Sequence, residues 1–247
     1  MALHRSDAFV LHTYKLGEAD QIVVLFTREF GKLRVVARRS HSLRRHPAST
    51  CQPLTLLNAI VFGRPNQTLY RLQGADIVQA FRPLQEDFGL LRSGLYATEL
   101  IDVATHEREP APELFALLHD TLEHLTRTTA PAAVLRLFEL RVLMVIGYTP
   151  QLECCAHCAR SLQPQACTFS PKLGGLLCPD CVPSARQTVT VSPAALAYLR
   201  LVMHGAAAEV LPSALDEATQ QDLERLLHVH LTSCLGRELK SYAFLHL

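Results

Sequence analysis

The sequence predicts an α+β protein of more than one domain, with a small N-terminal β-barrel, an α-helical bundle after it, and a four-cysteine module inserted in the bundle. Three observations predict this class. Short β-branched and aromatic segments alternate with turn residues up to about residue 80, apolar residues then recur with a helical period, and two Cys-x-x-Cys pairs interrupt the helical part. With 247 residues, 49% of them hydrophobic, the chain is long enough for two domains and a small insertion.

The N-terminal part predicts five strands and an exit segment. Gly17, Gly31, Gly74 and the run 63–66 (GRPN) separate the strands. Five or six strands in about eighty residues fit a small closed or partly open barrel, most commonly the oligonucleotide-binding (OB) fold, whereas a β-sandwich usually needs about seven. We therefore expect an OB-fold over residues 1–80, with strands at 8–14, 21–28, 32–37, 54–62 and 67–72 and an exit segment at 76–81.

Helices are predicted after Pro83. The expected buried stripes are Phe88, Leu91, Leu95 and Ile101 in the first helix and Leu114, Leu118, Leu122 and Leu125 in the second. A third helix over 132–146 is apolar nearly all round, which predicts the buried centre of a bundle, and Gly147 ends it. Further helices are expected at 193–204, at 216–235 and, as a short piece, at 237–247. The helical domain then comprises 81–151 and 184–247, with 152–183 as its insertion.

The two Cys-x-x-Cys pairs predict one structural zinc ion. Nineteen residues separate the pairs, and each pair lets one tight turn direct both sulfur atoms at a single ion. The alternative is two disulfides or idle buried cysteines. No signal peptide or long apolar span is present, so we expect a cytosolic chain whose thiols stay reduced. Cys154 is an alternative ligand, but it would lengthen the first pair. The predicted ligands are Cys155, Cys158, Cys178 and Cys181.

Basic residues are concentrated in the N-terminal part. The net charge of the chain is +1, yet residues 1–80 carry eleven Lys or Arg against five acidic residues, whereas 81–151 carry six against ten. The run 37–46 has four arginines, two histidines and no acidic residue, while a merely solvated loop usually mixes signs. Guanidinium groups suit phosphate oxygens. We expect a polyanion to contact Lys32, Arg34, Arg38, Arg39, Arg44, Arg45 and His46.

Six aromatic residues of the N-terminal part are candidates for stacking on bases, although their strand positions favour the core for most of them. They are Phe9, Tyr14, Phe26, Phe30, Phe62 and Tyr70.

Motifs for catalysis are missing. The chain has no phosphate-binding loop, no Gly-x-Ser-x-Gly and no His-Glu-x-x-His, and a four-cysteine zinc site has no open position for a water. The sequence therefore predicts a binding protein, not an enzyme.

Several motifs resemble the RecO family of bacterial recombination mediators. They are residues 16–21 (LGEADQ), 27–33 (TREFGKL), the first Cys-x-x-Cys, 169–171 (FSP) and 174–181 (GGLLCPDC), and the resemblance covers essentially the whole chain. It implies a cytoplasmic, nucleoid-associated protein without a membrane segment, whose barrel binds single- and double-stranded DNA. It also implies annealing of complementary strands and, with the partner RecR, loading of RecA onto strands coated by single-strand-binding protein.

The resemblance also has departures and gaps. Residues 36–40 (VARRS) lack the glycine common after the third strand in relatives, and some members lack the full set of cysteines, which implies a scaffolding metal. The family's helical domain binds the acidic tail of single-strand-binding protein, and the nearby cations here are Arg127, Arg136 and Arg141. Two other classes stay open, an RNA-binding zinc protein and a thiol-redox or metallo-enzyme.

Overall fold

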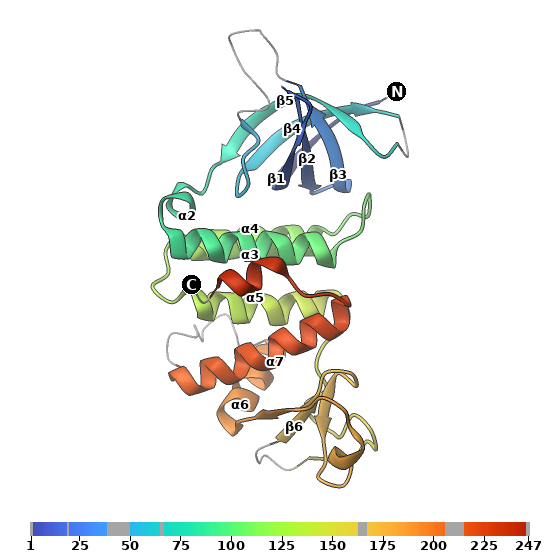
Figure 1. Cartoon of the computed structure of the whole chain (residues 1–247), viewed down its shortest axis with the longest axis vertical. Helices are drawn as coiled ribbons and strands as arrows, with labels where there is room; N and C mark the ends of the chain where they lie inside the picture. The colour runs from blue at the N-terminus through green and yellow to red at the C-terminus, as the bar shows by residue number, and fades with distance from the viewer. Residues whose placement is uncertain are drawn as a thin grey trace. The chain divides into compact units, whose positions relative to one another are not determined.

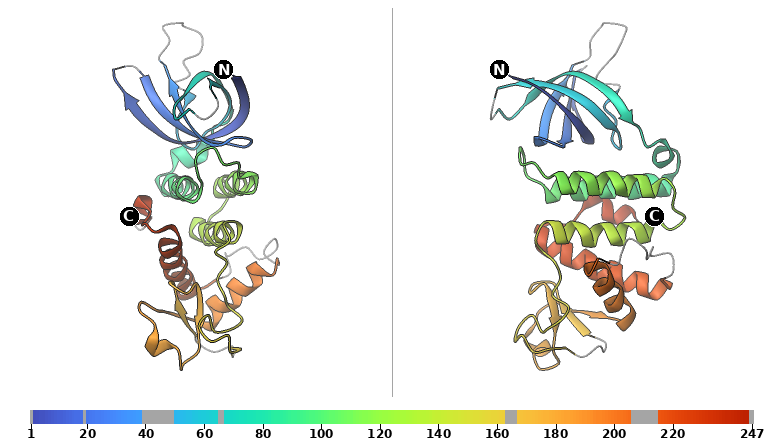
Figure 2. Two further views of the ribbon diagram at one scale, coloured as in Figure 1. Left: turned by 90° about the vertical axis from the view of Figure 1, so that its right-hand side faces the viewer. Right: turned by 180° about the vertical axis from the view of Figure 1, so that it is seen from behind.

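A computed structural model describes residues 2–18, 20–38, 50–64, 67–162, 167–205 and 215–245 (Figures 1 and 2). The chain divides into two compact units. Unit 1 comprises Met1–Arg127 with Ser241–Leu247, and unit 2 comprises Thr128–Lys240. The predicted domain boundaries near residues 80, 151 and 183 stay a prediction. None of the helices in the described ranges combines the length and the apolarity needed to cross a bilayer.

Unit 1 begins with a five-stranded closed barrel. Its strands are β1 (Ala2–Leu16), β2 (Asp20–Thr27), β3 (Gly31–Ala37), β4 (Leu56–Gly63) and β5 (Tyr70–Gln79), and their order around the barrel is β1-β2-β3-β5-β4. All neighbouring pairs are antiparallel except β3 and β5. This arrangement is the predicted OB-fold.

Two strand boundaries were predicted wrongly. β1 begins at Ala2 instead of residue 8, because its first half pairs with β4 and its second half with β2. β5 is one strand from Tyr70 to Gln79, where the sequence suggested a break around Gly74. The register of β4 against β5 shifts beside that glycine, between Ile60 and Val61, so a bulge takes the place of the predicted gap.

The barrel core follows from the alternation of side chains along each strand. Residues two apart point to the same side of a strand, and the inward positions here are almost all apolar. The tyrosine at the start of β5 and a cysteine from the segment before β4 complete the core. Its buried members are Ala8, Val10, Val23, Leu25, Leu33, Val35, Ala37, Cys51, Leu57, Ala59, Val61, Tyr70 and Leu72.

Three helices follow the barrel in unit 1, namely α2 (Arg82–Glu86), α3 (Phe88–Ala104) and α4 (Pro112–Leu125). Figures 1 and 2 show α3 and α4 side by side beneath the barrel. Phe115 of α4 packs on Phe9 and Phe26 of the barrel, with ring centroids 4.9 and 5.8 Å apart. Gly31 meets the loop between α3 and α4 so closely that a Cβ there would lie 2.1 Å from the Glu109 carbonyl oxygen.

The stripe predicted for α4 is confirmed, since its four leucines are all buried. The stripe predicted for α3 is partly wrong, because Phe88 is 67% exposed and Leu95 is 36% exposed. The buried face of α3 instead includes Gly94, where a Cβ would lie 2.9 Å from the Leu54 side chain. A small residue allows this close approach, and an apolar stripe does not reveal it.

The end of the chain returns to α3 as a short 3-10 helix, η4 (Lys240–Phe244). Glu99 of α3 is buried and accepts a hydrogen bond of 2.7 Å from the backbone N–H of Ser241. Arg92, one turn before Tyr96 on the same helix, donates to the Phe244 carbonyl oxygen at 2.8 Å. The short helical piece predicted near the end of the chain is therefore present as a 3-10 helix.

Unit 2 combines three helices with a small sheet. The helices are α5 (Pro131–Val145), α6 (Pro193–Met203) and α7 (Glu217–Leu235), and α7 packs against α5, α6 and the sheet. The sheet consists of β6 (Cys167–Ser170), β7 (Gly175–Leu177) and β8 (Val189–Val191) in the order β7-β6-β8. A single 3-10 turn, η1 (Val182–Ser184), follows the second cysteine pair. The sequence predicted the three helices but not the sheet.

Helix α5 is the buried centre that the sequence predicted, and its charged residues are buried too. Arg136 is 3% exposed and Glu139 is fully buried, and their side chains form an ion pair of 3.0 Å. Glu224 of α7 lies 3.7 Å from the same guanidinium group. Breaking a buried pair on one side leaves an uncompensated charge, so this cluster fixes how α5 and α7 pack.

Candidate nucleic-acid interface and metal centre

The outward face of β1, β2 and β3 carries a row of accessible side chains, called here the exposed row, in which Tyr14 is exposed and Ile22 and Val36 are half-buried. Tyr14 pairs with Ile22, and Ile22 pairs with Val36, so the three lie side by side across the strands. The parallel pairing of β3 with β5 extends the row from Val36 to Arg71. Tyr14 is 55% exposed, whereas Phe9 and Phe26 are buried. Among the candidate stacking residues, Tyr14 is therefore the one that offers most of its ring to solvent on this face.

The half of the same face that carries Phe9 and Phe26, called the lower half here, is covered by the helices of unit 1. Phe115 of α4 packs on the neighbouring residues Phe9 and Phe26. The Arg28 guanidinium group stacks on the Phe115 ring, 4.9 Å from its centroid. OB-folds bind oligonucleotides on the face of strands 2 and 3 and on two adjoining loops. Among the described residues, the helices of unit 1 leave uncovered the half of that face that carries Tyr14, Ile22 and Val36.

Lys32, which the sequence assigned to polyanion binding, is engaged within unit 1. Its Nζ donates to Asp102 Oδ1 at 2.9 Å and to the Thr105 carbonyl oxygen at 3.0 Å. His12 of β1 lies 3.3 Å from the other carboxylate oxygen of Asp102. Burial raises the pKa of Asp102, but hydrogen bonds from His12 and Lys32 outweigh burial and hold the pKa at about 2. The carboxylate thus ties two strands to α3.

Arg34 is the next outward residue of β3, and it is also paired. Its Nε lies 2.7 Å from Glu107 Oε1, and 58% of the arginine side chain stays exposed. Glu107 belongs to the loop between α3 and α4, which runs along the edge of β3 through the hydrogen bond from Arg108 N–H to the Lys32 carbonyl oxygen. Arg38, two residues beyond Val36, is 65% exposed and reaches Asp20 only at 4.0 Å.

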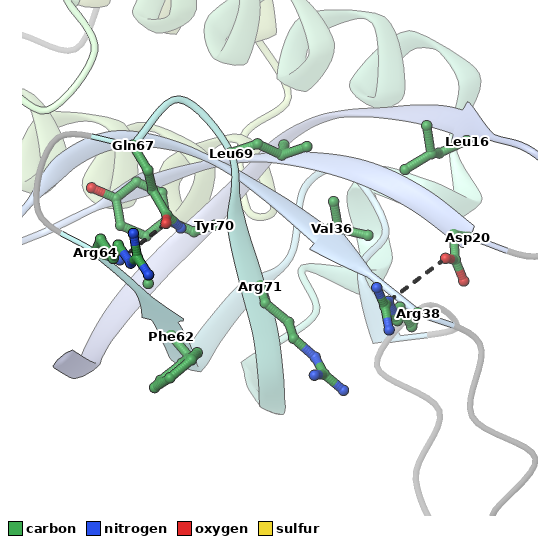
Figure 3. Close-up of a pocket in the computed structure, with 11 residues that line it drawn as sticks. Leu16, Asp20, Val36, Arg38, Phe62, Arg64, Gln67, Leu69, Tyr70 and Arg71 are labelled. Atoms are coloured by element: carbon green, nitrogen blue, oxygen red, sulfur yellow. Dashed lines mark hydrogen bonds and ion pairs between the residues drawn. The ribbon is translucent and has the colours of Figure 1, made fainter. Parts of the chain in front are cut away.

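A groove of about 440 Å³ opens beside this face, where β1, β3 and β4 end and β2 and β5 begin (Figure 3). Arg38, Arg64 and Arg71 line it, and Leu16, Phe62 and the other side chains drawn in Figure 3 form the rest of its wall. Arg64 and Arg71 are exposed and form no ion pair with any described residue. The groove therefore combines three exposed guanidinium groups with apolar side chains and one carboxylate, that of Asp20.

A hydrogen bond between Arg64 and Gln67, called the clasp here, shapes the turn that carries Arg64. The Gln67 side chain accepts a hydrogen bond of 3.0 Å from the Arg64 backbone N–H. Gly63 makes room for this amide, since a Cβ at residue 63 would lie 2.1 Å from Gln67 Nε2 and 2.5 Å from the Tyr70 ring. The clasp holds Arg64 at the edge of the groove.

The polyanion site predicted from sequence is only partly described by the structure. Lys32 and Arg34 lie on the outward side of β3, and Arg38 follows the last residue of that strand. Arg39, Arg44, Arg45 and His46 lie outside the described residues and stay predictions. Arg64 and Arg71 were missed, because they are distant in sequence from the basic run. The parallel pairing of β3 with β5 in an OB-fold is the signal that places Arg71 beside Val36.

The four predicted metal ligands gather in unit 2. The sulfur atoms of Cys155, Cys158, Cys178 and Cys181 all lie within 4.8 Å of one another, with Cys158 and Cys178 at 3.7 Å. Four thiolates at such distances fit a single tetrahedrally bound ion. The alternative ligand Cys154 is not part of this cluster, and its backbone forms an isolated bridge with Ser161.

The thiols of this cluster differ in acidity, since a side-chain hydrogen bond with Cys178 raises the pKa of Cys181 to about 12 while backbone groups lower that of Cys155. Burial raises the pKa of Cys155, but N–H groups of Cys178, Cys158 and His157 outweigh burial and lower the pKa from 9.0 to about 6. The N–H of Cys181 also donates to the Cys178 carbonyl oxygen at 2.9 Å, and this hydrogen bond closes the second Cys-x-x-Cys turn. A metal ligand must be deprotonated, so a thiol with a lowered pKa favours metal binding.

The cysteine cluster is attached to the rest of unit 2 through its sheet. Phe169 of β6 is buried and meets the His230 ring of α7 edge-on, with centroids 5.2 Å apart. His230 Nε2 lies 2.9 Å from the Tyr148 carbonyl oxygen, and burial lowers the pKa of this histidine. His230 is therefore a packing residue between α7 and the sheet.

The three cations considered for a partner's acidic tail differ in accessibility. Arg127 is 73% exposed at the end of α4 and pairs with Glu123 at 2.5 Å. Arg136 is buried in the ion pair of α5. Arg141 is half-buried on the same helix, and its charge opposes the increase that burial causes in the pKa of Tyr198, which reaches about 12.

Comparison with known proteins covers both parts of the chain. Residues 1–81 match the family model for the N-terminal part of recombination protein O, and residues 85–243 match the model for its C-terminal part. Curated relatives include the DNA repair protein RecO of Myxococcus xanthus, 36% identical over 99% of this chain and 98% of the relative. Those of Symbiobacterium thermophilum and Bacillus pumilus are 32% and 30% identical over 99% of this chain, covering 97% and 94% of the relatives.

Proposed function

Since the chain belongs to the RecO family of DNA repair proteins, we propose that it is a recombination mediator that binds single- and double-stranded DNA and anneals complementary strands. The observation that carries this proposal is the exposed row on the OB barrel beside a groove lined by three arginines. Phosphate contacts from arginines provide affinity without reading sequence. Such binding suits a protein that must act on any broken chromosome.

The two parts of this surface have different tasks in the proposal. Arg38, Arg64 and Arg71 hold phosphates of the strand in the groove. The ring of Tyr14 and the apolar side chains of Ile22 and Val36 receive unpaired bases, because stacking on aromatic rings tolerates every base. Duplex DNA contacts only the arginines, since its bases are already stacked. The basic residues Arg39, Arg44, Arg45 and His46 extend the phosphate path.

Annealing follows from charge neutralisation in this proposal. Two complementary strands repel each other through their phosphates, and bound arginines reduce that repulsion for one strand. From the family we extend the proposal to a cytoplasmic, nucleoid-associated protein that acts with RecR to load RecA onto strands coated by single-strand-binding protein. For the acidic tail of that protein, Arg127 and Arg141 are better placed than the buried Arg136. None of these steps needs catalysis by the chain itself.

We also propose that the four-cysteine cluster holds one Zn²⁺. Its donor set of four thiolates is the one that structural zinc sites use, and the lowered pKa of Cys155 fits an ionised ligand. The ion would supply stability, since four protein ligands leave no position for a reactive water. Its role is then to hold both cysteine turns and, through the sheet, to support α7.

Annealing of complementary DNA strands tests the proposed function most broadly. We expect the protein to speed annealing of bare strands and of strands coated by single-strand-binding protein. Competition with RNA of the same length separates the proposal from RNA binding, because a DNA mediator must keep its DNA when equal RNA is added. Annealing at the uncatalysed rate, or displacement of DNA by equimolar RNA, would contradict the proposal.

A further inference from the structure

The ion pair between Arg34 and Glu107 lies at the border between the covered and the exposed halves of the barrel face. Arg34 is two residues from Val36 on the outward side of β3 and four from Arg38, which follows the strand. At about 3.4 Å per residue, its Cα lies roughly 7 Å from that of Val36, which belongs to the exposed row. Arg34 is therefore a cation of β3 that lies beside the groove, and its guanidinium group is already bound to the Glu107 carboxylate.

Glu107 occupies the position that a phosphate would take on Arg34. Its carboxylate oxygen lies 2.7 Å from Arg34 Nε, and both side chains stay accessible, at 58% and 37%. Exposed pairs of this kind are weak, because water and salt screen them. A phosphate is the same kind of charge-assisted, bidentate acceptor for a guanidinium group as a carboxylate, so a DNA phosphate can take the place of Glu107.

The backbone of the loop that carries Glu107 is held against the barrel. It is fixed by the hydrogen bond from Arg108 N–H to the Lys32 carbonyl oxygen, 2.9 Å long. Lys32 Nζ also donates to the Thr105 carbonyl oxygen, and the Glu109 backbone packs on Gly31. Release of Arg34 therefore requires rotation of the Glu107 side chain alone, which is fast and needs no unfolding.

We propose that Glu107 is a built-in competitor for DNA, which holds Arg34 in the free protein and yields it to a phosphate on binding. The inference rests on the proposed function and deepens it. Glu107 limits affinity in this scheme, because each bound strand must first displace it. The limit is useful to a mediator, which must release its strand after annealing. Phosphates at Arg34 then extend the path of Arg38, Arg64 and Arg71 down β3.

The test compares two variants that remove the same charge from the same loop. Glu107→Gln frees Arg34, whereas Glu109→Gln leaves the pair intact, because the Glu109 carboxylate forms no ion pair among the described residues. Affinity for a short single strand is measured over a range of salt concentrations. We expect Glu107→Gln to tighten binding by up to about fivefold at low salt. We also expect its salt slope to match that of wild type, because Arg34 contacts the same phosphate in both proteins, whereas Arg34→Ala should flatten the slope by about 0.7.

A double-mutant cycle separates the ion pair from the general effect of charge. In an Arg34→Ala background, Glu107→Gln should improve binding no more than Glu109→Gln does. Equal effects of Glu107→Gln and Glu109→Gln in the wild-type background would overturn the inference, and so would a full effect of Glu107→Gln without Arg34. Failure of the proposed function looks different, because the wild-type protein would then show no salt-dependent DNA binding at all.

Discussion

Asp102 shows how one side chain joins the barrel of unit 1 to its helices. It accepts from Lys32 and lies against His12, and its pKa of about 2 is below the ordinary value of 3.8. A carboxyl whose pKa is lowered by folding stabilises the fold above its unfolded pKa, and the contribution disappears as the pH falls through the folded pKa. The relevant window is therefore about pH 4 to pH 2.

Asp102→Asn should lower the free energy of unfolding by about 2 kcal/mol at pH 7, from the size of this shift. Urea unfolding followed by circular dichroism measures it. The difference from wild type should shrink as the pH falls from about 4 towards 2, because protonation then removes the same interaction from the wild-type protein. Glu86→Gln on the exposed face of α2 is the control and should cost almost nothing. A difference that stays constant with pH would contradict the assignment.

Tyr14 carries the prediction that separates single strands from duplex. Its ring is 55% exposed, so Tyr14→Ala should change stability little. Loss of one stacked base should weaken binding to a single strand by about 1–3 kcal/mol and leave duplex binding nearly unchanged. Tyr148→Ala removes a ring of similar exposure from unit 2 and should affect neither. Equal losses for single strand and duplex would show that the ring does not stack on bases.

At the scale of elements, sequence reasoning succeeded where the signal is local. The two Cys-x-x-Cys turns and the leucine stripe of α4 each depend on residues close together in sequence. The sheet β7-β6-β8 escaped prediction, because its strands have only three or four residues. Such strands are too short for alternation to be recognised.

The groove escaped sequence analysis for a different reason. Arg71 reaches Val36 only through the parallel pairing of β3 with β5, and Arg64 is positioned by Gln67. Glu107 meets Arg34 through a loop more than seventy residues away in sequence. Charge counting finds basic runs, but it cannot show that Lys32 is already bound to Asp102. Pairing between distant segments decides which cations are accessible.

The metal centre gives a prediction at the scale of an element. Zinc in small structural sites is worth roughly 10–16 kcal/mol, far more than residues 152–183 can gain from their few buried apolar side chains. Cys178→Ser should abolish binding of the one zinc ion per chain and expose the amides of β6, β7 and β8 to hydrogen exchange. Amides of the barrel should keep their protection. Well under one zinc per wild-type chain, purified without chelator, would contradict the assignment.

At the scale of the whole molecule, the two units contain different features. Unit 1 contains the exposed row, the groove and the helices that cover the lower half of the barrel face. Unit 2 contains the cysteine cluster and the buried ion pair of α5. In the proposed function, DNA binds unit 1 through phosphate contacts in the groove, which is a small part of a nearly neutral chain.

The dependence of single-strand affinity on salt tests this claim most directly. Each phosphate contact adds about 0.7 to the slope of log K against log salt, so Arg38→Ala, Arg64→Ala and Arg71→Ala together should flatten it by about 2. The control removes three exposed arginines elsewhere, Arg82, Arg186 and Arg237, and should change the slope far less. Circular dichroism should be unchanged in both. A groove variant that keeps the wild-type slope would contradict the account, because the phosphates would then lie on another part of the protein.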